Sequence, residues 1–139
     1  MMYLTAGTFN IILRQASLLE IEETDIFDVL DIDNSLFEKT TNKVDSSIVG
    51  QSLEYMASQR PNIRIGLKMG FNFPVSVMGV MLNVYQNCRI LKDVFDKSPH
   101  YAPAVNTICL FSNHTDERYF YHSMKVADEF SNNYPIATR

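Results

Sequence analysis

The sequence predicts an α+β fold in which a helical N-terminal layer is followed by an antiparallel β-hairpin. Two observations predict it. Over about the first hundred residues apolar side chains recur at helical spacing, whereas from Val105 to Lys125 they alternate with a period of two. The turn-forming run Ser112–Asp116 separates the two alternating segments, as is typical of a hairpin. Helices first and strands later indicate α+β rather than an alternating βαβ arrangement.

Two helices are expected before residue 35. The first starts at Thr8, and its apolar residues have the spacing of one helix face. They are Phe9, Ile12, Leu13, Ala16 and Leu19. Thr24 is expected to cap a second, short helix, because its hydroxyl can accept from a free backbone amide and Asp25 then lies near the positive end of the dipole. A turn over Asp31–Asn34 follows.

Two further helices are expected before Pro74. Asp45 or Ser46 can cap the longer one, and Pro61 closes it. Its apolar stripe consists of Ile48, Val49, Leu53 and Met56. A shorter helix is expected over residues 62–70, where Gly66 and Gly70 would allow close packing against a neighbouring element.

The last helices lead into the hairpin. Residues 75–85 are apolar at nearly every position, which predicts a buried, central helix. An amphipathic helix carrying Val94 and Phe95 follows and is expected to end before the corner at residues 98–103. Residues 124–137 show no clear cap or terminal helix, so both hairpin faces are expected to remain uncovered. The chain is then a fragment, or a second copy completes its sheet.

Composition and charge exclude several classes. The 139 residues are 46% hydrophobic and carry a net charge of −4, which predicts one globular domain, residues 1–139, without the basic face that nucleic acids require. The two cysteines, Cys88 and Cys109, show no metal-binding spacing. The absence of a secretory signal and of a long apolar run predicts a cytoplasmic protein with free thiols and no membrane partner.

No catalytic or metal-binding motif occurs in the sequence. His100, His114 and His122 fall on a helix end, a loop and a strand, and no spacing brings them together. The adjacent acidic pairs lie in polar stretches where nothing would shift their pKa values. We therefore predict no catalytic residue, no metal and no cofactor, and a protein that is not an enzyme.

Aromatic and methionine side chains in the middle of the chain are the candidates for a ligand pocket. Methionine adapts to varied shapes, tyrosine adds a polar group to an apolar body, and a lysine or arginine would attract an acidic ligand. The candidate ligand-binding residues are Arg64, Lys68, Met78, Met81, Tyr85, Tyr101, Tyr119 and Tyr121. The alternative interpretation is that the apolar members are ordinary core residues.

Several of these segments resemble one known family. Ile65-Gly66-Leu67-Lys68-Met69-Gly70 resembles the "GL-basic-x-G" helix of the N-terminal regulatory domain, often called arabinose-binding-like, in one branch of the AraC-type bacterial transcription regulators. The apolar helix around Gly79 and the segment from Leu91 through Tyr101 resemble the helices that follow it there. Upstream, Ala16–Leu19 and Leu30–Asp33 resemble the family's opening pair of helices.

The resemblance implies a regulatory domain that senses a small-molecule effector or forms a homodimer. DNA would be bound only by the family's C-terminal pair of helix-turn-helix motifs, which these 139 residues do not contain. The resemblance therefore implies a fragment of a regulator, and it carries over neither ligand contacts nor a preference for arabinose. The alternative hypothesis is a stand-alone protein-interaction module that pairs with another chain through its exposed hairpin.

Overall fold

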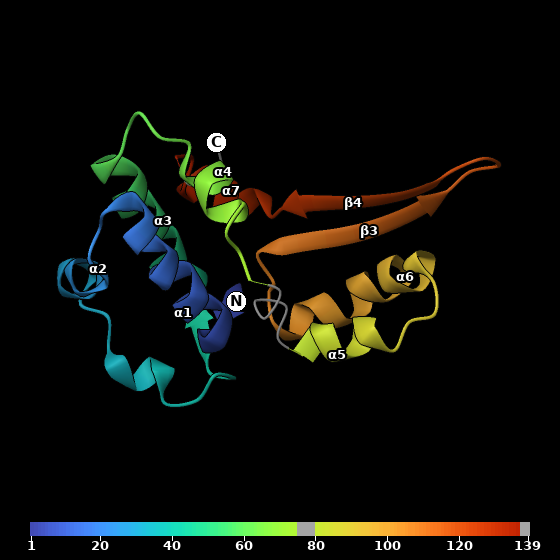
Figure 1. Cartoon of the computed structure of the whole chain (residues 1–139), viewed down its shortest axis with the longest axis horizontal. Helices are drawn as coiled ribbons and strands as arrows, with labels where there is room; N and C mark the ends of the chain where they lie inside the picture. Colours follow the sequence, from blue (N-terminus) through green and yellow to red (C-terminus); the bar gives the residue numbers. More distant parts are fainter. Residues whose placement is uncertain (75–79, 137–139) are drawn as a thin grey trace.

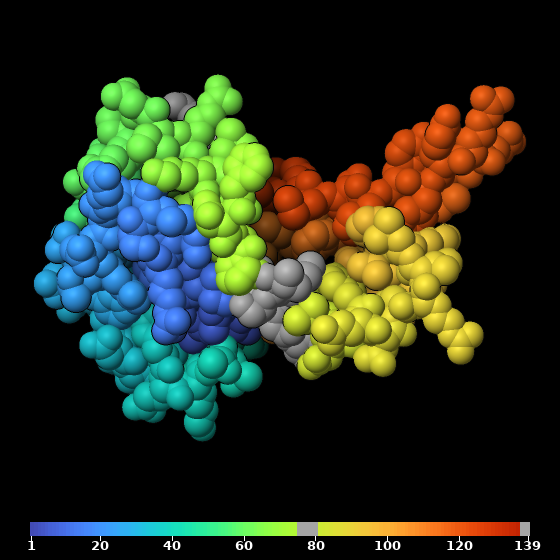
Figure 2. Space-filling model, in the orientation of Figure 1, coloured from blue at the N-terminus to red at the C-terminus, as the bar shows by residue number. Residues whose placement is uncertain are grey.

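The computed structural model describes residues 1–74 and 80–136, and its fold is α+β, as the sequence predicts. A helical body formed mainly by the N-terminal half lies beside a smaller unit of two helices and a long β-hairpin (Figure 1). The hairpin projects away from the helical body, and its tip stands clear of other atoms in the space-filling view (Figure 2). The hydrophobic core lies almost entirely in the helical body.

The helical body is assembled around the apolar stripe of its first helix. Its elements are β1 (Tyr3–Thr5), α1 (Ala6–Arg14), the 3-10 helix η1 (Gln15–Leu19), α2 (Glu23–Leu30), the 3-10 helix η2 (Asn34–Phe37), β2 (Lys43–Asp45), α3 (Ser46–Gln59), α4 (Ile65–Gly70) and α7 (Asp128–Asn133). Phe9 and Leu13 of α1 and Ala16 and Leu19 of η1 are fully buried. The predicted stripe is thus confirmed, although its last turn is a 3-10 helix.

Strand β1 holds the two parts of the molecule together, and the sequence analysis did not predict it. Tyr3 pairs with Asp45 of β2 in antiparallel register. On its other edge, the Thr5 amide donates to the Val105 carbonyl over 2.9 Å and the Thr107 amide donates to the Tyr3 carbonyl over 2.9 Å. A strand of three residues is too short to show a period in sequence, because its pairing depends on partners far along the chain.

Local capping signals are confirmed in one place and wrong in another. Asp45 is the N-cap of α3 and its Oδ1 accepts from the Ser47 amide over 2.8 Å. Thr24 is not the cap of α2, since that helix already begins at Glu23 and has Glu22 at its N-cap. Both residues occur before apolar helical stretches, so sequence spacing alone did not separate the true cap from the false one.

The two glycines predicted to allow close packing do not do so. Helix α4 is shorter than expected, and both Gly66 and Gly70 are exposed, with no atom within 4 Å of an added Cβ. The glycine that does allow close packing is Gly50 of α3. A Cβ built there would lie 2.3 Å from the Tyr134 ring, so the aromatic residue after α7 rests directly on the α3 backbone.

The smaller unit consists of α5 (Val80–Gln86), α6 (Leu91–Tyr101), the 3-10 helix η4 (Ala102–Ala104), β3 (Cys109–Thr115) and β4 (Phe120–Val126). The sequence predicts a buried, central helix over residues 75–85. Residues 80–85, which the structure describes, are helical but not central. Met81 is buried but Asn83 is exposed, and α5 lies at the side of the molecule against α6 (Figure 1). The remainder of that prediction, residues 75–79, lies outside the described residues.

Helix α6 and the hairpin both extend further than predicted. The helix continues through Pro99 to Tyr101 instead of ending before residue 98. Residues 112–115, expected to form the turn, belong to β3, and Thr115 pairs with Phe120 across a turn at residues 116–119. Asp116 Oδ1 accepts from the Arg118 and Tyr119 amides over 2.8 and 2.7 Å, which fixes that turn.

A terminal helix is present, contrary to the sequence prediction. Phe130 of α7 is buried in the core of the helical body, next to α3. The prediction was wrong because the six residues of α7 are too few to show a helical stripe, and one buried aromatic side chain anchors the helix. Within residues 1–74 and 80–136, no helix has the length and apolar character needed to span a bilayer.

Gly50→Ala is expected to destabilise the fold by about 1–3 kcal/mol, because the new methyl group overlaps the Tyr134 ring and forces it to move. Gly66→Ala is the matched control and should be neutral or stabilising by up to about 1 kcal/mol, since its Cβ meets open space in a helix. Urea unfolding measures the change in unfolding free energy for each variant. The same Gly50→Ala change in a Tyr134→Ala background should cost little; an undiminished cost there would contradict the overlap.

Asp45→Ala is expected to lower the free energy of unfolding by about 1 kcal/mol through loss of the α3 cap. Hydrogen bonds from the Ser47 hydroxyl and amide lower the pKa of the Asp45 carboxyl below 3.8. The charged cap therefore stabilises the fold above the unfolded-state pKa, and this contribution disappears as pH falls through the lower folded-state pKa. Urea unfolding of wild type and Asp45→Asn at pH 6 and pH 3 measures this contribution. A difference in unfolding free energy between the two proteins that is the same at both pH values would contradict the prediction.

Candidate functional site

A cavity of about 300 Å³ opens where the smaller unit meets the helical body. Helices α5 and α6 and both hairpin strands contribute to its lining, together with Thr8 of α1 and residues 102–106. The lining residues are Thr8, Met81, Tyr85, Val94, Phe95, Ser98, Ala102, Val105, Asn106, Phe111 and His122. Most are apolar, and a few polar groups converge among them, which is the usual composition of a small-molecule site.

His122 lies in an aromatic stack on one wall of this cavity. Its imidazole ring stacks on Phe95 of α6 with 4.5 Å between centroids, and on Phe111 of β3 with 5.7 Å. Phe95 also stacks on Phe120 at 6.2 Å. His122 and Phe120 are on the same hairpin face because they are two residues apart on β4. The ring of His122 is therefore held between a helix and a strand.

The protonation pattern of His122 follows from a proline in α6. Pro99 has no amide hydrogen, so the Phe95 carbonyl four residues earlier loses its helical donor. The Asn113 side chain replaces it, because its Nδ2 donates to the Phe95 carbonyl oxygen over 2.8 Å. Asn113 Oδ1 then faces His122 Nδ1 at 2.7 Å. Since that oxygen only accepts, Nδ1 carries the hydrogen, and Nε2 of the neutral ring is an acceptor.

A second set of hydrogen bonds joins α5 to α6. Ser98 Oγ donates to the Val94 carbonyl over 2.9 Å and lies 2.8 Å from the Tyr85 hydroxyl. Because the serine hydroxyl has a single hydrogen, the Tyr85 hydroxyl is the donor in their mutual contact. The Tyr85 hydroxyl also lies 3.9 Å from Met81 Sδ, a weaker acceptor for the same hydrogen. Tyr85 therefore offers the cavity an oxygen lone pair rather than a hydrogen.

The side chains of Asn106 and Thr8, which also line the cavity, each place an oxygen atom in a contact within the protein. Asn106 Oδ1 accepts from the Ile108 and Cys109 amides over 2.8 and 3.1 Å. Thr8 Oγ1 lies 3.0 Å from Thr5 Oγ1. Among the described residues, the lining contains no aspartate, glutamate, lysine or arginine. The cavity is thus uncharged when His122 is neutral, and it presents acceptors at His122 Nε2 and Tyr85.

In the part of the chain that the structure describes, the predicted ligand-binding residues do not share one site. Met81 and Tyr85 line this cavity. Lys68 and Tyr101 are exposed side chains outside it, and Met78 lies outside the described residues. Neither Arg64 nor Lys68 lines this cavity, because α4 lies on the helical body whereas α5, α6 and the hairpin form the cavity walls (Figure 1).

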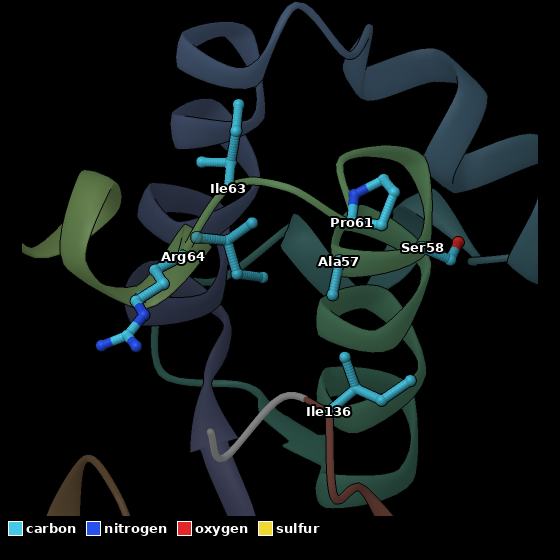
Figure 3. A pocket seen from close by; sticks show the side chains of 8 residues that line it. Ala57, Ser58, Pro61, Ile63, Arg64 and Ile136 are labelled. Carbon is cyan, nitrogen blue, oxygen red and sulfur yellow. The ribbon is translucent and has the colours of Figure 1, made fainter.

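Arg64 lines a different cavity, of about 580 Å³, between α3, the segment after it and Ile136. Figure 3 shows the Arg64 side chain extending away from α3 rather than toward Ala57 and Ile136. The guanidinium therefore does not converge with the other side chains on a bound group. Exposed Pro61, Ile63 and Ile136 make this a surface hollow with an apolar wall rather than an anion site.

Tyr119 and Tyr121 lie toward the hairpin tip and do not line the cavity that contains Met81 and Tyr85. They border a shallow hollow with Asp116 and Arg118. The Tyr121 hydroxyl donates to Asp116 Oδ2 over 2.9 Å, and this hydrogen bond raises the pKa of Tyr121. The Arg118 and Tyr119 amides, followed by the Tyr121 hydroxyl, lower the pKa of Asp116. Both tyrosine side chains are largely exposed, at 62% and 46%.

Sequence reasoning missed His122, Asn113 and Phe95 as site residues. The available signals were the alternation that places His122 and Phe120 on one strand face, and the proline inside an amphipathic helix. A proline in a helix indicates a free carbonyl, but which side chain reaches it depends on the tertiary structure.

The described residues form no group of three or more histidine, cysteine or acidic side chains that would hold a metal ion. Burial raises the pKa of the Cys109 thiol, which disfavours the reactive thiolate. Compared with known protein families and with curated proteins, the chain matches none of them.

Asn113→Ala is expected to destabilise the fold by about 1–3 kcal/mol, because it removes the partners of the Phe95 carbonyl and of His122 Nδ1. Ser112→Ala, on the exposed face of the same strand, is the control. In a Pro99→Ala background Asn113→Ala should destabilise the fold less, since residue 99 then supplies the missing helical amide. Urea unfolding of the four combinations tests this, and additive effects of the two substitutions would contradict it.

Proposed function

We infer that this chain is the N-terminal effector-sensing and dimerisation domain of a cytoplasmic AraC-type transcription regulator. In this proposal it forms a homodimer and controls DNA binding by a helix-turn-helix domain that the 139 residues do not include. Two independent features support the proposal. One is the resemblance carried by Ile65–Gly70, Leu91–Tyr101 and the opening helices. The other is the position of the cavity.

The position of the cavity is the observation that carries the sensing part of the proposal. Its lining includes Thr8 from the helical body and Met81, Phe95 and Phe111 from the smaller unit. The two parts are joined next to it by the bridge between Leu4 and Asn106. A molecule bound there would contact both parts at once, and its binding free energy would depend on how they are arranged.

Such a site supports a simple mechanism of control. A ligand that binds one arrangement of the two parts more tightly shifts the population toward that arrangement. In a homodimer this shift would change the spacing of the two attached DNA-binding domains, and thereby the half-sites they can reach. The net charge of −4 is compatible with this division of labour, because the basic surface that binds DNA would belong to the other domain.

The projecting hairpin supports a second candidate function, a module that binds another protein. The two faces and the tip of the hairpin expose large side chains that a monomer usually buries. They are Leu110, Tyr119, Tyr121 and Met124, with exposed fractions of 53%, 62%, 46% and 64%. This hypothesis requires neither a ligand nor an attached DNA-binding domain.

A fusion reporter tests the first proposal against the second. The full chain is fused to a DNA-binding domain that represses its promoter only as a dimer, and repression is measured with and without extracts of small metabolites. We expect repression that responds to the extract. Met81→Trp should abolish the response by filling the cavity, while Leu67→Trp, at a position that is 59% exposed, should preserve it.

Native mass spectrometry of the purified chain gives the second readout. A homodimer that retains a small molecule in wild type and loses it in Met81→Trp supports the sensor. A monomer without bound mass, combined with no repression in the reporter, would overturn the proposal. Partner binding lost in Leu110→Ser would then favour the interaction module.

A further inference from the structure

We propose that the cavity between α5, α6 and the hairpin selects a neutral, mainly apolar molecule that carries a hydroxyl group, and that His122 Nε2 accepts the hydrogen of that hydroxyl. This inference rests on the proposed function for its biological meaning, but its chemistry is argued from the cavity alone. It names the ligand class and the residue that recognises it.

The size of the cavity sets the size of the ligand. An apolar cavity of about 150 Å³ is enough to hold benzene, and ordinary ligand pockets begin at about 300 Å³. The present cavity, at about 300 Å³, thus suits a molecule of one or two rings or an equivalent branched chain. The lining disfavours a sugar phosphate or a nucleotide, because no described lining residue is a lysine or an arginine.

The apolar lining sets the character of most of the ligand surface. Met81, Val94, Val105 and the ring of Phe111 provide aliphatic and aromatic contacts. A ligand carboxylate would lose its hydration without gaining a cationic partner, and a ligand ammonium would find no described anionic one. The neutral form is therefore the one that this cavity accommodates.

His122 sets the polar contact. The sequence of hydrogen bonds from the Phe95 carbonyl through Asn113 to Nδ1 leaves Nε2 as the acceptor of the neutral ring. No hydrogen-bond partner of Nε2 occurs among the described residues. The stack between Phe95 and Phe111 prevents the ring from turning freely, so the acceptor direction is fixed before a ligand arrives.

Tyr85 strengthens the preference of the cavity for a ligand that donates a hydrogen bond. Its own hydrogen is directed to Ser98, which in turn donates to the Val94 carbonyl. At His122 and Tyr85, the polar atoms that face a ligand are therefore acceptors. A hydroxyl group satisfies one of them, whereas an ether or ketone of the same shape offers no hydrogen and leaves both unsatisfied.

The experiment compares three probes on the full chain by isothermal titration calorimetry: 4-ethylphenol, ethylbenzene and benzoate. We expect 4-ethylphenol to bind about tenfold more tightly than ethylbenzene, as one net hydrogen bond allows, and benzoate not to bind. In His122→Phe, which keeps an aromatic ring in the stack, the two neutral probes should bind equally. His114→Phe, on the exposed hairpin face, should behave as wild type.

A measurement on wild type covers the case in which His122→Phe does not fold. The ¹⁵N chemical shift of His122 Nε2 should move toward the hydrogen-bonded value with 4-ethylphenol and stay in place with ethylbenzene. Equal affinities for the two probes, or an unmoved Nε2 shift, would overturn the role of His122. Tighter binding of benzoate, or no binding of either neutral probe, would overturn the ligand class. The fusion reporter decides the regulatory function separately, because it uses none of these probes.

Discussion

The pairing of β1 on both of its edges is the constraint on which the rest of the structure depends. Three residues, Tyr3–Thr5, join β2 on one side and residues 105–107 on the other. Leu4 is buried at the centre of this junction and forms a bridge with Asn106. The α5–α6–hairpin unit contributes little to the main core, so this junction and the return of α7 onto α3 determine where it sits. The cavity exists because the two parts meet there without closing completely.

The hydrogen-bonding chemistry of the cavity follows from one place in α6 where a side chain replaces a missing backbone donor. Pro99 frees the Phe95 carbonyl, Asn113 satisfies it from the hairpin, and the orientation of that amide fixes the tautomer of His122. Each hydrogen bond restricts the orientation of the next group. The free carbonyl in α6 therefore leads to a defined hydrogen-bond acceptor on β4, His122 Nε2. A polar network of this kind specifies one arrangement only when every member is satisfied, and here Asn113 satisfies both neighbours.

The elements that sequence reasoning predicted well are those whose signals are local. Phe9 and Leu13 recur at helical spacing and are buried, and Asp45 caps α3 through a residue only two positions away. The hairpin was predicted, but its turn was misplaced. Residues 112–115 have turn-forming side chains, yet they pair with residues 120–123 because Asn113 contacts both α6 and His122. Tertiary contacts there outweighed local turn propensity.

The sequence by itself determined the α+β class, the apolar face of the first helix, and the alternation that puts Phe120 and His122 on one side of a strand. It also limited the cap of α3 to Asp45 or Ser46. The tertiary structure decided which side chains share a site. It separated Arg64 and Lys68 from Met81 and Tyr85, and brought Asn113 to a carbonyl eighteen residues away in the chain. The physical reason is range: periodicity and capping act within a few residues, whereas a cavity is defined by surfaces that meet only after the chain has folded.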